Sequence, residues 1–247
     1  MGKFAHDTVM PLKNSNLSKK EQVADMFDSI AFRYDFLNRF LSAGIDVWWR
    51  KKAIKQIADL KPQSVLDVAT GTADVALMTY DMLHPKKITG IDISVGMLDL
   101  GRKKIAARGL ENTIELFTGD SENIAFADNT FDAITVSFGV RNFQNLSKGL
   151  EEMLRVLKPG GKLVVLEFSK PKNKLFKGFY NLYMNVIAPS FGKLFAKNKD
   201  AYQYLNDSVQ AFPEGNAFVG IMQEAGFKQT YLHTLTLGIC SIYCGTK

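Results

Sequence analysis

The stretch of residues 64–74 constrains the fold most, because a short apolar run changes there into a glycine turn and then into a helical pattern. Val65, Leu66 and Val68 suit a strand that is buried on both faces. Gly71 gives the backbone the freedom to turn close to a ligand. Open α/β sheets bind ligands beyond the carboxyl ends of their strands, which is where such a loop lies. The stretch therefore predicts a strand, a tight ligand-binding loop and a helix, in that order.

A second apolar run, residues 88–91, ends in Asp92. At the tip of the next strand, this carboxylate can accept hydrogen bonds from both hydroxyls of a ribose. The first loop lacks the three glycines that approach a pyrophosphate, since Gly71 is followed by Thr-Ala-Asp, and no Walker lysine follows. A phosphate-free nucleoside with an ammonium, a carboxylate and a sulfonium suits this loop, which indicates S-adenosylmethionine. The alternative, that Asp67 and Asp92 merely form turns, stays open.

Strands and helices alternate along the middle of the chain. Further strands are predicted at three places: 114–117, 131–138 and 162–168. A helix is predicted over about 146–157, and it ends at the turn sequence of residues 158–161. Right-handed crossovers then give a mostly parallel sheet with helices on both faces. The runs 228–235 and 238–245 predict an antiparallel hairpin at the sheet edge, so the fold class is α/β.

Residues 1–60 precede the first strand and are predicted to form an N-terminal helical lid. Within them, residues 1–18 are expected to form a loose polar arm, and a helical pattern begins at Lys19. Helices in this position can lie across the ligand edge of the sheet, and a layer packed on the flank of the sheet is the alternative. The main domain is predicted at 61–247, with a helical insert at about 169–226.

The first half of the insert is basic and aromatic. Residues 169–199 contain seven lysines and no acidic residue, with aromatic side chains between the lysines. An interfacial helix needs this combination, because each lysine near an anionic leaflet contributes on the order of 1 kcal/mol. The segment therefore predicts peripheral contact with an anionic membrane surface. The alternative is a capping helix that lines the substrate pocket with its apolar side while its lysines are solvated.

The composition is that of a globular domain, with 46% hydrophobic and 23% charged residues. No apolar run approaches the roughly eighteen residues that span a bilayer, and residues 1–10 lack the apolar core of a signal peptide. Cys240 and Cys244, with three scattered histidines, make no metal-binding set. The net charge of +6 allows an anionic partner. We expect a cytoplasmic chain without a metal, peripheral on the inner face of the cytoplasmic membrane.

Three stretches are similar to signatures of one family. They lie at 27–38, 138–142 and 155–171, and they include Phe-Asp-Ser-Ile-Ala-Phe-Arg-Tyr-Asp, Phe-Gly-Val-Arg-Asn and Leu-Glu-Phe-Ser-Lys-Pro. The chain resembles the C-methyltransferases of menaquinone and ubiquinone biosynthesis, from about Val23 to the carboxyl end. The resemblance implies the class I S-adenosylmethionine-dependent methyltransferase fold, which is Rossmann-like.

The loop analysis and the resemblance together assign the residues of the site. The predicted cofactor-binding residues are Gly71, Thr72, Asp92, Asp120, Ser121 and Ser137. The resemblance implicates Arg141 in catalysis, and we assign Asn142 and Tyr34 to positioning the acceptor ring. Ala73 departs from the family loop, which usually reads Gly-Thr-Gly-Asp. If this position needs a positive φ, alanine costs about 1 kcal/mol, and we expect weaker or shifted cofactor binding.

The resemblance implies a polyprenylated hydroquinone as the methyl acceptor, namely demethylmenaquinol, with the benzoquinol of ubiquinone biosynthesis as the alternative. Loss of a phenolic proton makes the neighbouring ring carbon electron-rich, and the protein must hold that carbon and stabilise the phenolate. Arginine is not a base at ordinary pH, so Arg141 is predicted to stabilise the phenolate or to orient a water that takes the proton. The alternative is that Arg141 only forms a salt bridge with Asp35 or Glu167.

Two other functions stay open. A nucleic-acid methyltransferase would use the basic charge, but the Asn/Asp-Pro-Pro-aromatic signature of amino-directed base methyltransferases is missing after the fourth predicted strand. No nucleic-acid partner is therefore expected. The second is a cofactor-binding scaffold without activity.

For the oligomeric state, a homodimer is left open.

Overall fold

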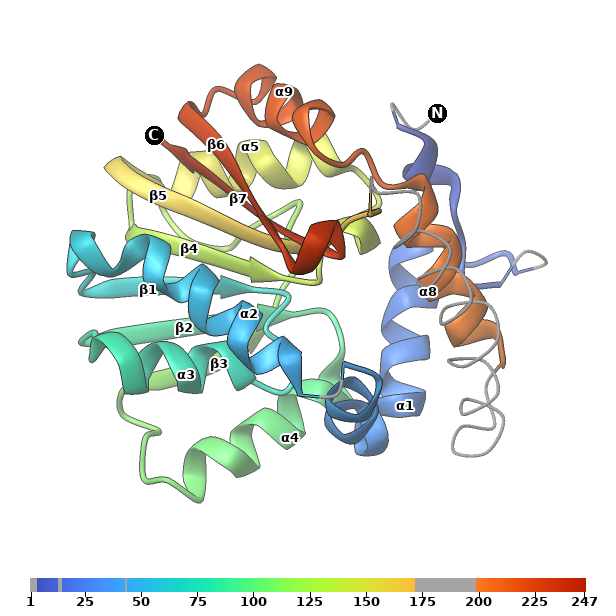
Figure 1. Cartoon of the computed structure of the whole chain (residues 1–247). Coiled ribbons are helices and arrows are strands. Elements are labelled where there is room, and N and C mark those ends of the chain that lie inside the picture. The colour runs from blue at the N-terminus through green and yellow to red at the C-terminus, as the bar shows by residue number, and fades with distance from the viewer. Residues whose placement is uncertain (1–3, 13–14, 43, 172–198) are drawn as a thin grey trace.

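One mixed sheet organises the part of the chain that the structure describes. The computed structural model describes residues 4–12, 15–42, 44–171 and 199–247 (Figure 1). The strand order is β3-β2-β1-β4-β5-β7-β6; β1 to β5 run parallel, and β7 is antiparallel to both of its neighbours. The strands are β1 Ser64–Val68, β2 Lys87–Asp92, β3 Ile114–Thr118, β4 Phe131–Ser137, β5 Leu157–Phe168, β6 Lys228–Leu235 and β7 Cys240–Thr246.

The order of the parallel strands in the sheet has its switch point at β1. β2 and β3 lie on one side of β1, whereas β4 and β5 lie on the other. Asp67 of β1 is thus opposite both Gly90 of β2 and Thr135 of β4. A switch point of this kind opens a crevice beyond the carboxyl ends of the strands on either side of it. The loops that were predicted to bind ligands therefore meet at one edge of the sheet.

Helices cover both faces of the sheet and its carboxyl edge. Side chains of α2, α3 and α4 belong to the apolar core on one face, and those of α5 and α9 belong to the core on the other. α1 and α8 lie beyond the carboxyl ends of the strands (Figure 1). The helices are η1 Ala5–Thr8, α1 Lys19–Leu41, α2 Ile45–Ile54, η2 Lys55–Leu60, α3 Asp74–Leu83, α4 Val95–Ala106, η3 Val140–Asn142, α5 Leu146–Val156, α8 Lys199–Ala211, α9 Asn216–Glu224 and η5 Thr236–Gly238.

The five predicted parallel strands and the C-terminal hairpin are confirmed. Four consecutive residues of β1 are buried, as a strand covered on both faces requires. One boundary is wrong, because the fifth strand begins at Leu157 and includes the turn predicted at 158–161. Leu157 and Lys162 pair with residues of β4 that are only two positions apart. The residues between them form a bulge in which Gly160 has φ 77°.

The prediction of a loose arm is wrong for residues 5–8, whereas residues 9–12 are irregular as predicted. Residues Ala5–Thr8 form the 3-10 helix η1, in which His6 is fully buried. The imidazole ring packs against Phe4 and against Phe212, with ring centroids 6.1 and 5.7 Å apart. A single helical turn is too short to produce a hydrophobic period, so the sequence carries no pattern that would reveal this contact.

The residues before β1 divide between a face and an edge of the sheet. α2 packs on the face, where the ring of Trp49 lies 6.3 Å from those of Phe138 and Phe168. α1 crosses the carboxyl edge, where Asp28 accepts a hydrogen bond from the Gly96 N–H of α4 at 2.9 Å. The two placements that the sequence left open thus occur in different helices. The division of the chain into residues 1–60 and 61–247 stays a prediction.

The described part of the insert contains two helices, α8 and α9. Most of residues 169–199, including five of the seven lysines, lie outside the described residues. The predicted membrane contact through this segment therefore stays a prediction. Of the helices in the described ranges, none is both long and apolar enough to cross a bilayer.

Candidate active site

A cavity lies between α1 and the carboxyl ends of β1, β2, β3 and β4. Most of the predicted site residues line it: Tyr34, Gly71, Asp92, Asp120, Ser121, Ser137 and Asn142. Two predicted residues, Thr72 and Arg141, are not among the lining residues. The fold thus brings seven of the predicted residues around one cavity, whereas Thr72 and Arg141 lie outside its lining.

Asp92 joins the end of β2 to the loop after β1. Its carboxylate accepts hydrogen bonds from the N–H groups of Gly71 and Ser94, at 2.8 and 2.9 Å. Gly71 has φ 55°, a left-handed conformation that glycine adopts without cost. Burial raises the pKa of Asp92 even though backbone N–H groups stabilise its charge. The carboxylate has acceptor sites beyond these two bonds, which is the arrangement that a ribose diol requires.

Asp67 has a structural part instead. It is 2% exposed and accepts hydrogen bonds from the hydroxyls of Thr70 and Thr135, both at 2.6 Å. Burial raises the pKa of Asp67 to about 6, while these two hydroxyls lower it. The carboxylate ties the loop after β1 to β4 and does not line the cavity. The alternative reading of Asp67 as a turn former is therefore correct, whereas Asp92 faces the cavity.

Asp120 and Ser121 follow β3 and form the rim of the cavity nearest to the start of α1. Lys20 of α1 forms ion pairs with Asp120 at 2.5 Å and with Glu122 at 2.9 Å. Lys20 also lines the cavity, and sequence reasoning missed it. No local pattern could have found it, because its partner lies 100 residues away along the chain.

Thr72 belongs to a polar network next to the cavity. Its hydroxyl donates to Asp35 of α1 at 2.6 Å and accepts from Lys104 of α4 at 2.9 Å. Lys104 also pairs with Asp35 at 2.5 Å and with Asp74 at 2.7 Å. In this structure the Thr72 side chain links α1, the loop after β1 and α4, and it does not face the cavity.

Ala73 occupies a backbone conformation that favours glycine. It has φ 63° and ψ 20°, and its side chain is fully buried. The condition under which an alanine is strained here is thus met. The surroundings are tight as well, because a Cβ added at Gly101 of α4 would lie 3.2 Å from that of Ala73.

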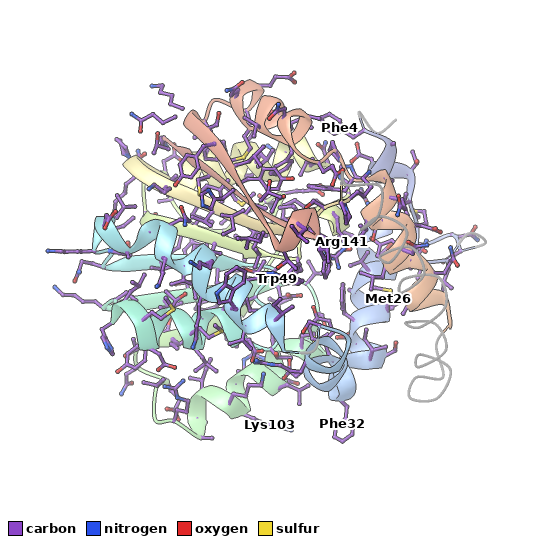
Figure 2. All side chains as sticks on the ribbon, viewed as in Figure 1. Phe4, Met26, Phe32, Trp49, Lys103 and Arg141 are labelled. Carbon is purple, nitrogen blue, oxygen red and sulfur yellow. The ribbon has the colours of Figure 1, made fainter. Side chains whose placement is uncertain are left out.

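Arg141 lies at the end of the sheet that faces α1 and α8 (Figure 2). It is 6% exposed, and its guanidinium donates to Glu167 Oε1 at 2.8 Å and to the carbonyl of Phe138 at 2.6 Å. The guanidinium carbon is 5.5 Å from the ring centroid of Phe168. The salt bridge to Glu167 that the sequence left open is therefore present, and the alternative partner Asp35 is wrong.

Glu167 is the buried counter-ion of this arginine. It is fully buried at the end of β5 and also accepts the N–H of Phe168 at 2.8 Å. Burial raises the pKa of Glu167, and the Arg141 cation opposes that effect. Lys19 contacts the backbone of the same arginine, since its ammonium donates to the carbonyls of His6 and Arg141 at 2.7 and 3.4 Å. Burial lowers the pKa of Lys19 to about 8.

Tyr34, Asn142 and Ser137 line the cavity from three elements. The Tyr34 ring stands edge-on to Phe27 of the same helix, with centroids 5.8 Å apart. Asn142 lies in η3, and its side-chain oxygen is buried without a hydrogen-bond partner among the described residues. These groups leave an aromatic face and a free amide oxygen for a ligand.

No group of three His, Cys, Asp or Glu side chains within the described ranges could hold a metal ion. Cys240 and Cys244 are buried as free thiols in β7.

Comparison with known proteins identifies the family. The model of the ubiE/COQ5 methyltransferase family matches residues 15–247. A demethylmenaquinone methyltransferase of Bacteroides fragilis is 44% identical over 99% of this chain and 99% of its own length. A ubiquinone/menaquinone biosynthesis C-methyltransferase UbiE of Geotalea daltonii is 49% identical over 93% of this chain and 97% of its own.

Solved structures are similar in fold. A putative methyltransferase of Bacillus halodurans superposes with a TM-score of 0.54 at 29% identity, covering 73% of this chain and 69% of its own. A Haemonchus contortus N-methyltransferase in complex with S-adenosylhomocysteine has a TM-score of 0.67 at 14% identity, over 94% of this chain and 60% of its own. The family model that matches residues 15–247 and the relatives that are 44% and 49% identical over nearly the whole chain lead to one conclusion: this chain belongs to the ubiE/COQ5 methyltransferase family.

Proposed function

We propose that the chain transfers the methyl group of S-adenosylmethionine to a ring carbon of a reduced polyprenyl quinone precursor, and that this precursor is demethylmenaquinol. The observation that carries the proposal is that Asp92, Asp120, Tyr34 and Asn142 all line the same cavity. The name of the full-length Bacteroides fragilis relative supports the naphthoquinol acceptor.

The benzoquinol step of ubiquinone biosynthesis is the second candidate. It is favoured by the Geotalea daltonii relative, whose name covers both pathways. The two acceptors differ in the ring fused to the quinol, so relative turnover on a naphthoquinol and a benzoquinol of equal chain length separates the candidates.

The residues around the cavity fit S-adenosylmethionine. Asp92 suits the ribose hydroxyls, and Asp120 with Ser121 suits the amino group and ring nitrogens of adenine. The apolar side chains of Val68 and Met97 line the same cavity and suit a purine ring. When bound, S-adenosylmethionine supplies a methyl group made electrophilic by the adjacent sulfonium.

Arg141 is proposed to stabilise the phenolate of the acceptor. Two of its bonds go to Glu167 and Phe138, whereas its Nε has no hydrogen-bond partner among the described residues. That N–H is free to donate to a phenolate oxygen, and a charged donor is effective at this buried position because the local dielectric constant is low. Glu167 is a positioning residue, since it holds the guanidinium in place.

The proton balance needs no basic side chain. The phenolic hydroxyl loses its proton to water, and the electron pair left on oxygen raises the electron density of the neighbouring ring carbon. That carbon forms the new bond to the methyl group as the bond between the methyl and sulfur breaks and its electron pair stays on sulfur, leaving S-adenosylhomocysteine. The proton of that carbon then returns to the oxygen through water. One proton is released overall. Tyr34 and Asn142 are proposed to hold the ring in the orientation that this attack requires.

α1 is proposed to act as the lid of the site. Its contacts support this proposal: Lys20 pairs with Asp120, Asp28 binds the start of α4, and Asp35 binds Thr72. Each contact reaches a loop at the edge of the cavity. The role of the Thr72 hydroxyl is then to hold the lid, although the resemblance assigns it to the cofactor.

Peripheral membrane contact through residues 169–199 is part of the proposal, because the acceptor carries a polyprenyl chain. The seven lysines without an acidic residue and the net charge of +6 support it. Sedimentation with anionic phosphatidylglycerol vesicles should be salt-sensitive, and sedimentation with phosphatidylcholine vesicles should be absent. Equal sedimentation with both would contradict an electrostatic contact. Sedimentation equilibrium tests for the homodimer.

The proposed reaction is tested with purified protein, S-adenosylmethionine and a short-chain demethylmenaquinone, with and without dithionite. We expect methylation, detected by mass, only when the quinone is reduced. Equal rates with the oxidised quinone would remove the proposed nucleophile. Arg141→Ala should lower turnover strongly and leave the affinity for S-adenosylhomocysteine nearly unchanged. The reverse pattern would make Arg141 a binding residue.

A further inference from the structure

Three buried polar atoms of η3 and α8 have no hydrogen-bond partner among the described residues. They are Nε of Arg141, Oδ1 of Asn142 and the hydroxyl of Tyr204. Tyr204 lies on α8 and is 3% exposed. A buried polar atom without a partner is unfavourable, and native proteins contain few of them. Three such atoms in one region are the donors and acceptors that a bound polar group, from a ligand or from an ordered water, would satisfy.

The three atoms belong to one region because the elements that carry them pack together. α8 packs against η3, which contains both Arg141 and Asn142. The hydroxyl of Tyr204 lies within electrostatic reach of the ion pair: burial raises the pKa of Tyr204, the Arg141 charge lowers it and the Glu167 charge raises it. Asn142 also lines the cavity, so this region adjoins the proposed cofactor site.

The chemistry of the three atoms defines their ligand. The Nε–H of arginine only donates, the side-chain oxygen of asparagine only accepts, and a tyrosine hydroxyl does both. A ligand that satisfies them must therefore accept from Arg141 and donate to Asn142 with the same or adjacent atoms. A phenolic hydroxyl meets this requirement, whereas an ether or a carbonyl oxygen can only accept.

We infer that Tyr204 binds the methyl acceptor, and that its hydroxyl, together with Arg141 Nε and Asn142 Oδ1, holds the phenolic oxygen beside the carbon that is methylated. This inference rests on the proposed function and adds α8 of the insert to the acceptor site. When the phenolic proton leaves to water, its electron pair stays on the oxygen. Arg141 and Tyr204 then both donate to that oxygen, so Tyr204 is a catalytic residue that stabilises the phenolate.

Tyr204→Phe tests the inference, because it removes the hydroxyl and leaves the ring. Loss of one donor to a developing oxyanion typically costs about a hundredfold in turnover, so kcat on the reduced quinone should fall on the order of 10²-fold. The affinity for S-adenosylhomocysteine should not change. The melting temperature should be unchanged or higher, because the variant removes a buried hydroxyl that the protein itself does not satisfy.

The matched control is Tyr231→Phe. Tyr231 lies on β6 and is 39% exposed, and its hydroxyl donates to the side-chain oxygen of Gln56 at 3.1 Å. This variant should keep the wild-type turnover. A second readout is the affinity for 4-methoxy-1-naphthol, which keeps one phenolic hydroxyl of the quinol and has the other blocked as an ether, measured anaerobically by calorimetry with S-adenosylhomocysteine present. Tyr204→Phe should weaken this binding about tenfold, and Tyr231→Phe should not.

The outcomes separate the inference from the proposed function. If the wild type binds the naphthol but methylates no reduced quinone, the proposed reaction fails, and the naphthol affinity of Tyr204→Phe still decides the inference. Wild-type turnover and naphthol affinity in Tyr204→Phe would overturn the inference. A Tyr204→Phe variant that melts several degrees lower or fails to fold would also overturn it, because the hydroxyl would then be bound within the protein.

Discussion

Lowering the pH is predicted to destabilise the docking of the N-terminal arm, because His6 is buried in its neutral form. The imidazole is fully buried between Phe4 and Phe212. Burial lowers the pKa of His6 from 6.5 to about 4; the Lys19 charge adds to this effect and the Asp7 charge opposes it. The unfolded chain therefore binds a proton at His6 at a higher pH than the folded chain does.

The sign and the size of the effect follow from these two pKa values. The contribution to stability is fully present above the unfolded pKa of 6.5 and is lost as the pH falls toward the folded pKa of about 4. One pH unit between the two values is equivalent to about 1.4 kcal/mol, so the full contribution of His6 is about 3 kcal/mol. Between about pH 7.5 and about pH 5, the expected loss is about 2 kcal/mol.

Urea denaturation of the wild type and of His6→Phe at these two pH values measures this loss. Phenylalanine keeps an aromatic ring between Phe4 and Phe212 but does not titrate. The other titrating groups are common to both proteins and cancel in the difference between their unfolding free energies. We expect that difference to shift by about 2 kcal/mol in favour of the variant at the lower pH. A shift below about 0.5 kcal/mol would refute the reasoning, because His6 would then titrate alike in both states.

Three further predictions concern the loop, the lid and the buried ion pair. Ala73→Gly should raise the unfolding free energy by about 1 kcal/mol and tighten S-adenosylhomocysteine binding, because glycine relieves the positive φ; calorimetry that finds both quantities unchanged would contradict strain at this position. Lys20→Met should speed release of S-adenosylhomocysteine by up to about fivefold in stopped flow, because its partly exposed pair with Asp120 contributes at most about 1 kcal/mol; release at the wild-type rate would exclude a lid contact. Glu167→Gln should lower the unfolding free energy by about 3 kcal/mol, because it leaves the Arg141 cation buried without a counter-charge; a loss below about 1 kcal/mol would mean that water reaches the pair.

Residues at the end of a strand, or in the loop just after it, were predictable from the sequence. Gly71 and Asp92 each come after an apolar run, and the carboxyl ends of parallel strands meet at the same edge of a sheet. Ser137 at the end of β4 follows the same rule. Their places around the cavity therefore needed only the positions of the strands, which the apolar runs already show.

Arg141 shows where such reasoning stops. The sequence left Asp35 and Glu167 as equally acceptable partners, and both are carboxylates close to the predicted edge. In the structure Glu167 ends β5, which pairs with β4 and so lies next to Arg141, whereas Asp35 on α1 is held by Lys104 at 2.5 Å. Which carboxylate pairs with Arg141 depends on the angle at which α1 crosses the sheet. The hydrophobic periodicity of the chain does not predict that angle.

The sequence by itself determined where the five parallel strands lie along the chain and which loops carry the proposed cofactor residues, because these features depend on neighbours within a few positions. Only the tertiary structure decided that Lys20 reaches Asp120, that Thr72 binds Asp35 and does not line the cavity, that His6 is buried and that α8, which carries Tyr204, packs against η3, which carries Arg141. Each of these contacts joins elements far apart in the chain. Their side chains meet only after the packing of helices on the sheet has set the distance and the angle between them.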